Sequence, residues 1–334
     1  MHALYIESAR RVTLTEVDSP RPQTGHVLID VDYVGICGSD LHYFYDGVNG
    51  AFVVREPLIP GHELSGRVAQ DPAGNLEPGQ PVTVHPARFG PEQPKYPEHP
   101  HLWPGGSYLG SASTWPHTQG AAVGQLLVEA RMVVPLPEAL PVRRAVLAEP
   151  LAVAMHGAAK AGDLRGKDVL VSGAGPIGLL ALVAARAGGA VAVDVSDVLD
   201  GPLARAQALG ADSVINVAQT QLPVNDYDVI LECSGAPGAI SAVLTAVRPA
   251  GAVVQIGMAP NEVKPINLAP YIAKEVRLLG SFRFKDEIAE AVGILAADAN
   301  IEGIITHEFG LEAAEEAFSA AKDAQSSGKV VLRL

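Results

Sequence analysis

The stretch of residues 169–194 constrains the fold more than any other part of the chain. It begins with a short apolar run at 169–172 and continues with glycines at 173, 175 and 178. An Ala- and Leu-rich run and a second apolar run follow, ending at Asp194. In a strand–turn–helix–strand unit, the three glycines allow a tight turn, approach of a pyrophosphate, and close packing of helix on strand. The pattern predicts a dinucleotide site with the phosphates at a helix N-terminus.

Asp194 lies 21 residues after Gly173, where an acidic side chain is expected to accept hydrogen bonds from the adenosine ribose hydroxyls. A membrane span is the alternative, because residues 169–185 are uncharged. That run is shorter than the ~20 apolar residues a span needs, and it contains Gly-x-Gly-Pro. A βαβ unit is therefore favoured.

The patterns on either side of this unit differ. Residues 2–35 alternate apolar and polar positions, which indicates short antiparallel strands. After residue 200, helical and strand patterns alternate, which is typical of a doubly wound parallel sheet. The fold class predicted is α/β, with a Rossmann coenzyme domain and a second, mainly β domain. We expect helices near 203–209, 239–247, 286–298 and 311–322, and strands near 27–34, 213–216, 227–232, 252–256 and 330–334.

Charge and cysteine content exclude several functions. The net charge is −13 and no basic cluster occurs, so nucleic acid and anionic membranes are not expected as partners. Cys37 and Cys233 are the two cysteines, too few for a disulfide framework, and residues 1–7 lack the pattern of a signal peptide. A cytoplasmic location is expected.

Three residue types suggest a metal site. Cys37 and His62 lie in turns flanked by glycine, and Glu63 and Glu149 are carboxylate candidates. Thiolate, imidazole and carboxylate together suit zinc. The alternatives stay open: Cys37 as a small buried apolar residue, His62 as a hydrogen-bonded turn residue, Glu63 as a solvated acid, and Glu149 as an acid favoured at a helix start.

Four ordered motifs carry a resemblance: G-I-C-G-S-D-L-H-Y, G-H-E-L-S-G-R-V, A-E-P-L-A-V-A-M-H and S-G-A-G-P-I-G. Through them the chain resembles, over essentially its whole length, the zinc-dependent medium-chain alcohol and polyol dehydrogenases. Within that family it looks like the sorbitol and L-idonate branch, and L-G-S-A-S-T-W-P-H and G-S-F-R-F are most similar to the L-idonate 5-dehydrogenase group. The resemblance implies a GroES-like catalytic domain at 1–151 and 289–334 and a Rossmann NAD domain at 152–288.

The resemblance also implies roles for individual residues. Cys37 and His62 would be ligands of one catalytic Zn²⁺, with Glu149 preferred to Glu63 as the third ligand. Ser39 and His42 would pass on the proton of the substrate. The positions implied to contact the cofactor are Gly173, Gly175, Pro176, Ile177, Gly178, Asp194, Cys233, Ile256, Gly257, Met258, Phe282 and Arg283.

The implied reaction is hydride transfer between NAD and a secondary alcohol. For a sugar acid such as L-idonate, Arg283 is the first candidate to bind the carboxylate and His117 the second. Contact with the cofactor or a surface ion pair is an equal alternative for Arg283. Tyr43 and Trp115 are candidate pocket walls, although such aromatics are more often core. A polyol dehydrogenase and a non-catalytic NAD-binding protein are the other hypotheses.

Two departures from the family pattern matter. The lobe that often holds a structural zinc corresponds to residues 86–106, which contain no cysteine and six prolines, so that second zinc is not expected. After Asp194, the acids Asp197 and Asp200 would repel a 2′-phosphate, which favours NAD over NADP. A homodimer or homotetramer is expected, with residues 253–257 as a possible edge strand.

Overall fold

The computed structural model describes residues 1–334, which divide into two compact units. The first contains Met1–Glu149, Ile288–Asp323 and Lys329–Leu334, and the second contains Pro150–Glu287 and Ala324–Gly328. The predicted boundaries place residues 324–328 in the catalytic domain, whereas the structure places them in the second unit. The limits of the functional domains stay a prediction. No helix has both the length and the apolar composition that crossing a membrane requires.

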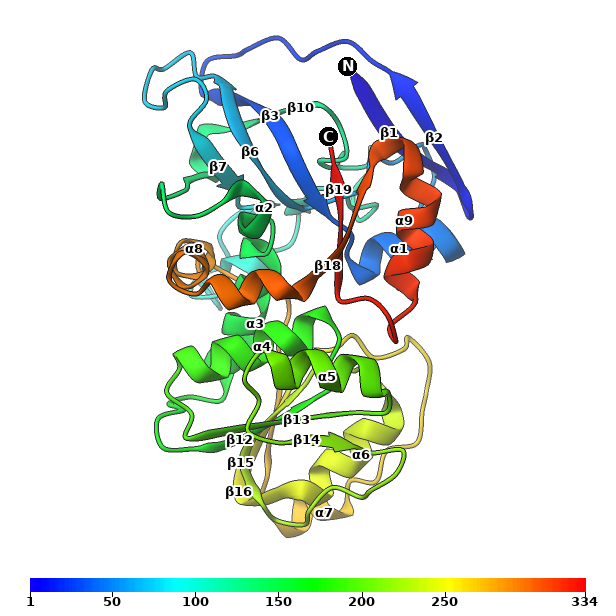
Figure 1. Cartoon of the computed structure of the whole chain (residues 1–334), viewed down its shortest axis with the longest axis vertical. Coiled ribbons are helices and arrows are strands. Elements are labelled where there is room, and N and C mark those ends of the chain that lie inside the picture. The colour runs from blue at the N-terminus through cyan, green and yellow to red at the C-terminus, as the bar shows by residue number, and fades with distance from the viewer. The chain divides into compact units, whose positions relative to one another are not determined.

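The first unit is built on a seven-stranded sheet in the order β11-β7-β6-β3-β19-β18, with β10 also paired to β3 (Figure 1). Every pair is antiparallel except β18–β19. In the central strand, Val27, Ile29 and Val31 alternate into the core, as the period of two predicts. The strands are β3 (His26–Gly35), β6 (Glu63–Gln70), β7 (Pro81–Val84), β10 (Gln125–Glu129), β11 (Val133–Pro135), β18 (Ile305–Gly310) and β19 (Lys329–Arg333).

Smaller elements complete this unit. Three two-stranded sheets pair β1 (His2–Ser8) with β2 (Arg11–Glu16), β4 (Val48–Asn49) with β5 (Phe52–Val53), and β8 (Ala87–Arg88) with β9 (Ser107–Tyr108). The helices are α1 (Gly38–Asp46), α2 (Val142–Ala145), α8 (Ile288–Ala297) and α9 (Ala314–Lys322), with 3-10 turns η1 (Pro100–Leu102), η2 (Ala130–Met132), η3 (Ala299–Ile304) and η4 (Leu311–Ala313). The rings of Phe44 and Phe318 stack at 4.5 Å and join α1 to α9.

The proline-rich residues 86–106 form an irregular segment, as predicted, apart from β8 and η1. The indole Nε1 of Trp103 donates to the carbonyl of Tyr96 at 3.1 Å and closes the segment on itself. This hydrogen bond joins positions seven residues apart within the segment.

The second unit is the predicted doubly wound sheet. Its six strands are all parallel, in the order β14-β13-β12-β15-β16-β17. They are β12 (Asp168–Ser172), β13 (Ala192–Asp197), β14 (Val214–Asn216), β15 (Tyr227–Glu232), β16 (Val247–Gln255) and β17 (Arg277–Gly280). Helices α4 (Pro176–Ala187) and α5 (Asp200–Ala208) cover one face and α6 (Pro237–Ala246) the other, as Figure 1 shows; α3 (Ala148–Lys160) and α7 (Ala269–Ala273) complete the helices.

The edge strand was placed wrongly by the sequence analysis. Residues 253–255 belong to β16, which has β15 on one side and β17 on the other. The edge on this side is β17, whose R-L-L-G sequence is too short for its period to be read. The opposite edge of the sheet is β14.

Candidate metal and dinucleotide sites

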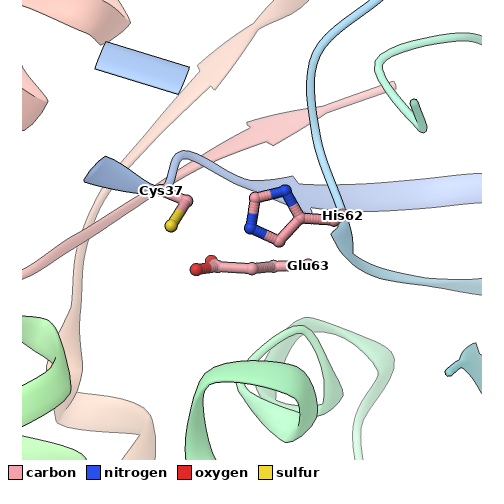
Figure 2. Close-up of side chains that lie close together, drawn as sticks. All are labelled: Cys37, His62 and Glu63. Atoms are coloured by element: carbon pink, nitrogen blue, oxygen red, sulfur yellow. The ribbon is translucent and has the colours of Figure 1, made fainter. Parts of the chain in front are cut away.

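Three side chains of the first unit meet as a metal-ligand set. Cys37, His62 and Glu63 each offer one ligand atom, and these atoms all lie within 4.8 Å of one another (Figure 2). Cys37 follows β3 and is the N-cap of α1, whereas His62 and Glu63 lie where a turn enters β6. The ring of His62 is 7% exposed and Glu63 is 1% exposed.

Two glycines make room for this arrangement. Gly35 lies opposite Glu63 in the β3–β6 ladder, and a Cβ built on it would lie 2.1 Å from Oε2 of Glu63. Gly61 has φ +95°, which L side chains rarely adopt, so the turn before His62 depends on glycine. Gly35 is therefore required by the position of the Glu63 side chain, and Gly61 by the backbone of the turn.

Asp40 connects the two loops. Its buried carboxylate accepts the backbone N–H of Cys37 at 3.0 Å and the backbone N–H of Gly61 at 3.2 Å. One side chain thereby fixes the position of Cys37 relative to the turn that carries His62. Asp40 was not among the residues predicted for this site.

Lys329 on β19 holds one oxygen of Glu63. Its Nζ lies 2.7 Å from Oε1, and the side chains are 3% and 1% exposed. The same ammonium donates to the carbonyl of Ile36 at 3.2 Å. Oε2 of Glu63 is buried and has no hydrogen-bond partner. Because a buried charged oxygen without a partner is costly, this atom fits a bound cation.

The electrostatics of the site also fit a cation. Burial works against a charged ring of His62, but Cys37, Asp40 and Glu149 together outweigh it and raise the pKa of His62 to about 10. Burial also raises the pKa of Asp40 and of Glu149, so it opposes their negative charge. The raised pKa of His62 shows that the position among these acidic groups favours a positive charge. A thiolate, an imidazole and a carboxylate with a free oxygen are a suitable donor set for Zn²⁺.

Glu149 lies outside this three-residue set. It is 5% exposed, and its Oε1 accepts the hydroxyl of Tyr108 at 2.5 Å. The ring of Tyr108 meets that of His62 edge to face at 5.4 Å. The arrangement brings Glu63 rather than the preferred Glu149 to Cys37 and His62. Tyr108 and Lys329 were missed, because neither lies in a motif that suggests metal chemistry.

The predicted proton-transfer residues both lie on α1. Ser39 is half-buried in the first turn, two residues after Cys37. His42 is exposed, with its Nδ1 3.2 Å from Oδ2 of Asp46 one turn later. The helix thus leads from Cys37 to the surface of the unit.

The predicted substrate residues of the first unit have different environments. Tyr43 is 1% exposed, and its hydroxyl accepts the backbone N–H of Ala112 at 3.2 Å, so it is a core residue. Trp115 is 64% exposed. His117 is buried, its Nε2 accepting the backbone N–H of Arg55 at 2.9 Å and its Nδ1 lying 2.9 Å from the carbonyl of Thr114. Both ring nitrogens of His117 are therefore occupied by the backbone.

The glycine-rich turn of the second unit has the expected geometry. Gly173 has φ +93°, and a Cβ on Gly178 would lie 1.8 Å from the carbonyl oxygen of Gly173, so both positions require glycine. A Cβ on Gly175 would meet nothing within 4 Å. Gly175 is the N-cap of α4, which starts with Pro176 and Ile177. Open space beside a bare helix N-terminus fits a pyrophosphate.

The acid next to this turn is Asp197 rather than Asp194. Asp194 pairs with Leu170 in mid-strand, and its carboxylate accepts the hydroxyl of Tyr227 at 2.9 Å. Asp197 ends β13 and accepts the backbone N–H of Ala174 at 2.7 Å. Sequence reasoning ended the strand three residues early, because the alternation V-D-V-S-D resembles a strand end at its first acid.

The remaining cofactor candidates follow the ends of neighbouring strands. Cys233 comes directly after β15, and Ile256, Gly257 and Met258 come after β16. Phe282 and Arg283 follow β17; Arg283 has φ +51°, and its guanidinium lies 4.9 Å from the centre of the Phe282 ring. All lie after the carboxyl ends of parallel strands, where α/β sheets bind ligands.

Comparisons with known proteins agree with this division. Residues 23–138 match the family model of the alcohol dehydrogenase GroES-like domain, and residues 176–297 match that of the zinc-binding dehydrogenases. L-idonate 5-dehydrogenase (NAD(P)(+)) of Escherichia coli is 34% identical over 318 residues, which are 91% of each chain. Sorbitol dehydrogenase of Gallus gallus is 33% identical and covers 96% of this chain and 93% of its own.

Solved structures show the same relationship. The crystal structure of L-idonate 5-dehydrogenase from Escherichia coli K-12 has a TM-score of 0.94 and 33% identity, covering 100% of this chain and 98% of its own. The predicted resemblance and fold class are therefore confirmed. The chain belongs to the zinc-binding dehydrogenases with a GroES-like domain, in the branch of polyol and sugar-acid enzymes, and is an alcohol or polyol dehydrogenase acting on a small molecule.

Proposed function

We propose that the protein oxidises a secondary alcohol of a sugar acid with NAD as hydride acceptor, converting L-idonate to 5-keto-D-gluconate. The observation that carries this proposal is the Cys37–His62–Glu63 set, in which His62 and Glu63 are buried and one carboxylate oxygen of Glu63 has no hydrogen-bond partner. The first unit is the GroES-like catalytic part and the second is the NAD-binding part. The near-equal identities to an L-idonate and a sorbitol dehydrogenase make a neutral polyol the second candidate substrate.

Cys37, His62 and Glu63 would hold Zn²⁺, which supplies Lewis-acid chemistry that lowers the pKa of an alcohol hydroxyl. Lys329 keeps Oε1 of Glu63 and leaves Oε2 for the ion. Ser39 accepts the hydroxyl proton of the substrate, and the exposed His42 releases it to solvent.

The second unit binds the cofactor, which carries the hydride. The backbone around Gly175 at the start of α4 takes the pyrophosphate. Asp197, in place of Asp194, accepts the ribose hydroxyls. Asp197 and Asp200 concentrate negative charge beside this position, which disfavours the 2′-phosphate of NADP. The nearby cation Arg205 donates to the carbonyls of Ala324 and Gln325 instead of facing this position. NAD is therefore favoured over NADP.

Arg283 is proposed to bind the carboxylate of the sugar acid, since the ring nitrogens of His117 are both engaged by the backbone. A guanidinium pairs with a carboxylate through two parallel hydrogen bonds.

The protein is proposed to be cytoplasmic and a homodimer or homotetramer. β17 has a neighbour on one side only, and Leu278 on it is 41% exposed. Val263 and Ile272 nearby in the chain are 101% and 72% exposed. A free edge next to exposed apolar side chains favours pairing with a second copy.

Initial rates with NAD and either L-idonate or sorbitol test the substrate, together with metal analysis of the purified protein. We expect one zinc per chain and the higher kcat/KM on L-idonate. Activity on the neutral polyol alone would reject the sugar-acid assignment, and a metal-free, inactive protein would reject the dehydrogenase mechanism.

A further inference from the structure

Glu232 is a fully buried carboxylate of the second unit. It has no role in the reaction proposed above. It ends β15, is 0% exposed, and lies opposite Gln255, which ends β16. No lysine or arginine pairs with it. A buried carboxylate without a cation is expensive unless several donors satisfy it, so its surroundings need an explanation.

The carboxylate is satisfied entirely by donors from two turns. Oε1 accepts the backbone N–H of Ser234 at 3.0 Å and also its hydroxyl. Oε2 accepts the backbone N–H of Gly235 at 2.9 Å and the side-chain Nε2 of Gln255 at 2.5 Å. That Nε2 also donates to the carbonyl of Gly257 at 2.7 Å. One side chain therefore ties the turn after β15 to the turn after β16.

The two turns are also in backbone contact. The N–H groups of Ile256 and Gly257 both donate to the carbonyl of Glu232 at 2.8 Å. A Cβ on Gly257 would lie 2.5 Å from the backbone nitrogen of Gly235, and a Cβ on Gly235 would lie 2.1 Å from the carbonyl oxygen of Met258. The turns fit together only as a pair, with the Glu232 carboxylate beneath them.

The place of these turns in the sheet indicates which half of the cofactor they meet. The strand order β14-β13-β12-β15-β16-β17 consists of two mononucleotide halves that diverge between β12 and β15. The glycine-rich turn and Asp197 belong to the half that takes the adenosine end. The turns held by Glu232 belong to the other half, at its carboxyl edge. They are therefore placed to meet the nicotinamide end.

We propose that Glu232 is a positioning residue for the nicotinamide half of the dinucleotide, which it orders through the turns at 233–235 and 256–258. This rests on the proposed binding of NAD by the second unit. Glutamine at this position would have one acceptor oxygen instead of two and would turn its NH₂ toward N–H donors. Part of the free energy of dinucleotide binding would then be used to order the two turns, so the affinity would fall.

The test compares NADH with ADP-ribose, which lacks the nicotinamide, by calorimetric titration of the full chain. Glu232→Gln is expected to weaken NADH binding about tenfold or more, the effect of losing a hydrogen bond to a charged group, and to leave ADP-ribose binding within about twofold. Glu275→Gln, the same change at an exposed acid of the same unit, is expected to alter neither.

Equal weakening of both ligands, or no weakening of either, in Glu232→Gln would overturn the proposal. If that variant does not fold, Gln255→Leu decides, because it removes one of the four donors; it should weaken NADH selectively, and unchanged NADH affinity contradicts the proposal. Failure of the unmodified protein to bind either ligand would instead reject the proposed function.

Discussion

Two buried glutamates of this chain illustrate different ways to keep a carboxylate away from water. Glu63 in the first unit has one oxygen on the ammonium of Lys329 and the other without a partner. Glu232 in the second unit has both oxygens filled by four donors. The first is the proposed metal ligand, with one oxygen not hydrogen-bonded, and the second joins two turns of the backbone. Residue type and burial are the same, so the partners decide the role.

The largest effect is expected at the unsatisfied carboxylate. Glu63→Gln should lower zinc affinity by about a hundredfold or more, and should cost the zinc-free protein about 3 kcal/mol because Lys329 loses its buried partner. Chelator competition and urea unfolding measure the two quantities. Glu149→Gln is the matched variant and should retain zinc. If Glu63→Gln retains zinc and Glu149→Gln loses it, Glu149 and not Glu63 is the third ligand.

The partner of that carboxylate gives the second prediction. Lys329→Met should lower the free energy of unfolding of the zinc-free protein by about 3 kcal/mol, since Glu63 is left as an uncompensated buried charge. Saturating zinc should restore most of this loss, because the ion replaces the missing positive charge. Lys95→Met, at an exposed lysine of the same unit, is the control. An equal loss with and without zinc would contradict the account.

A third carboxylate, at the glycine-rich turn, extends the comparison to the cofactor. Asp197→Ser should raise KM for NAD and lower KM for NADP, shifting the ratio of kcat/KM by about ten- to a hundredfold toward NADP, because it removes a charge that repels the 2′-phosphate. Asp194→Ser should leave the ratio unchanged, since Asp194 binds Tyr227. If Asp194→Ser shifts the ratio and Asp197→Ser does not, Asp194 is the residue that contacts the ribose.

The smallest effect concerns Glu287, a carboxylate of the second unit paired with the Nδ1 of His156 at 2.6 Å. Burial opposes its charge, but the hydrogen bond from His156, the backbone hydrogen bonds and the charge of His156 together outweigh it and lower the pKa of Glu287 from 4.5 to about 2. A lowered pKa contributes stability that is complete above pH 4.5 and disappears as the pH falls through 2.

Glu287→Gln should therefore remove about 1 kcal/mol of stability at neutral pH, allowing for solvent screening, and flatten the loss between pH 4.5 and 2. Urea unfolding across this range measures it. Parallel pH profiles for the variant and the unmodified protein would show that the pair contributes nothing.

Much of the molecule is predictable from local pattern. The glycine-rich turn, with Gly173 and Gly178, and the turn before His62, with Gly61, depend on glycines that the backbone itself requires. The errors arise where the deciding partner is distant in sequence. Lys329 is 266 residues from Glu63, and His117 is occupied by a backbone N–H 62 residues away. No rule of sequence spacing predicts such contacts, because they form only when distant segments pack together in the fold.

Asp197 and β17 were missed for a more local reason. Short strands carry too few residues for their period to be read, so their ends are uncertain by several positions. Moving the end of β13 by three residues changes which acid reaches the turn.

The distance in sequence between Glu63 and Lys329 also affects how the chain matures. During synthesis at ~5–20 residues per second, roughly 10 to 50 s pass after residue 63 is made before residue 329 follows. Throughout that interval the nascent first unit has its thiolate, imidazole and carboxylate but not the strand that neutralises the acid. A metal ion captured early would have to stand in for that missing ammonium, which makes zinc supply a determinant of folding yield as well as of activity.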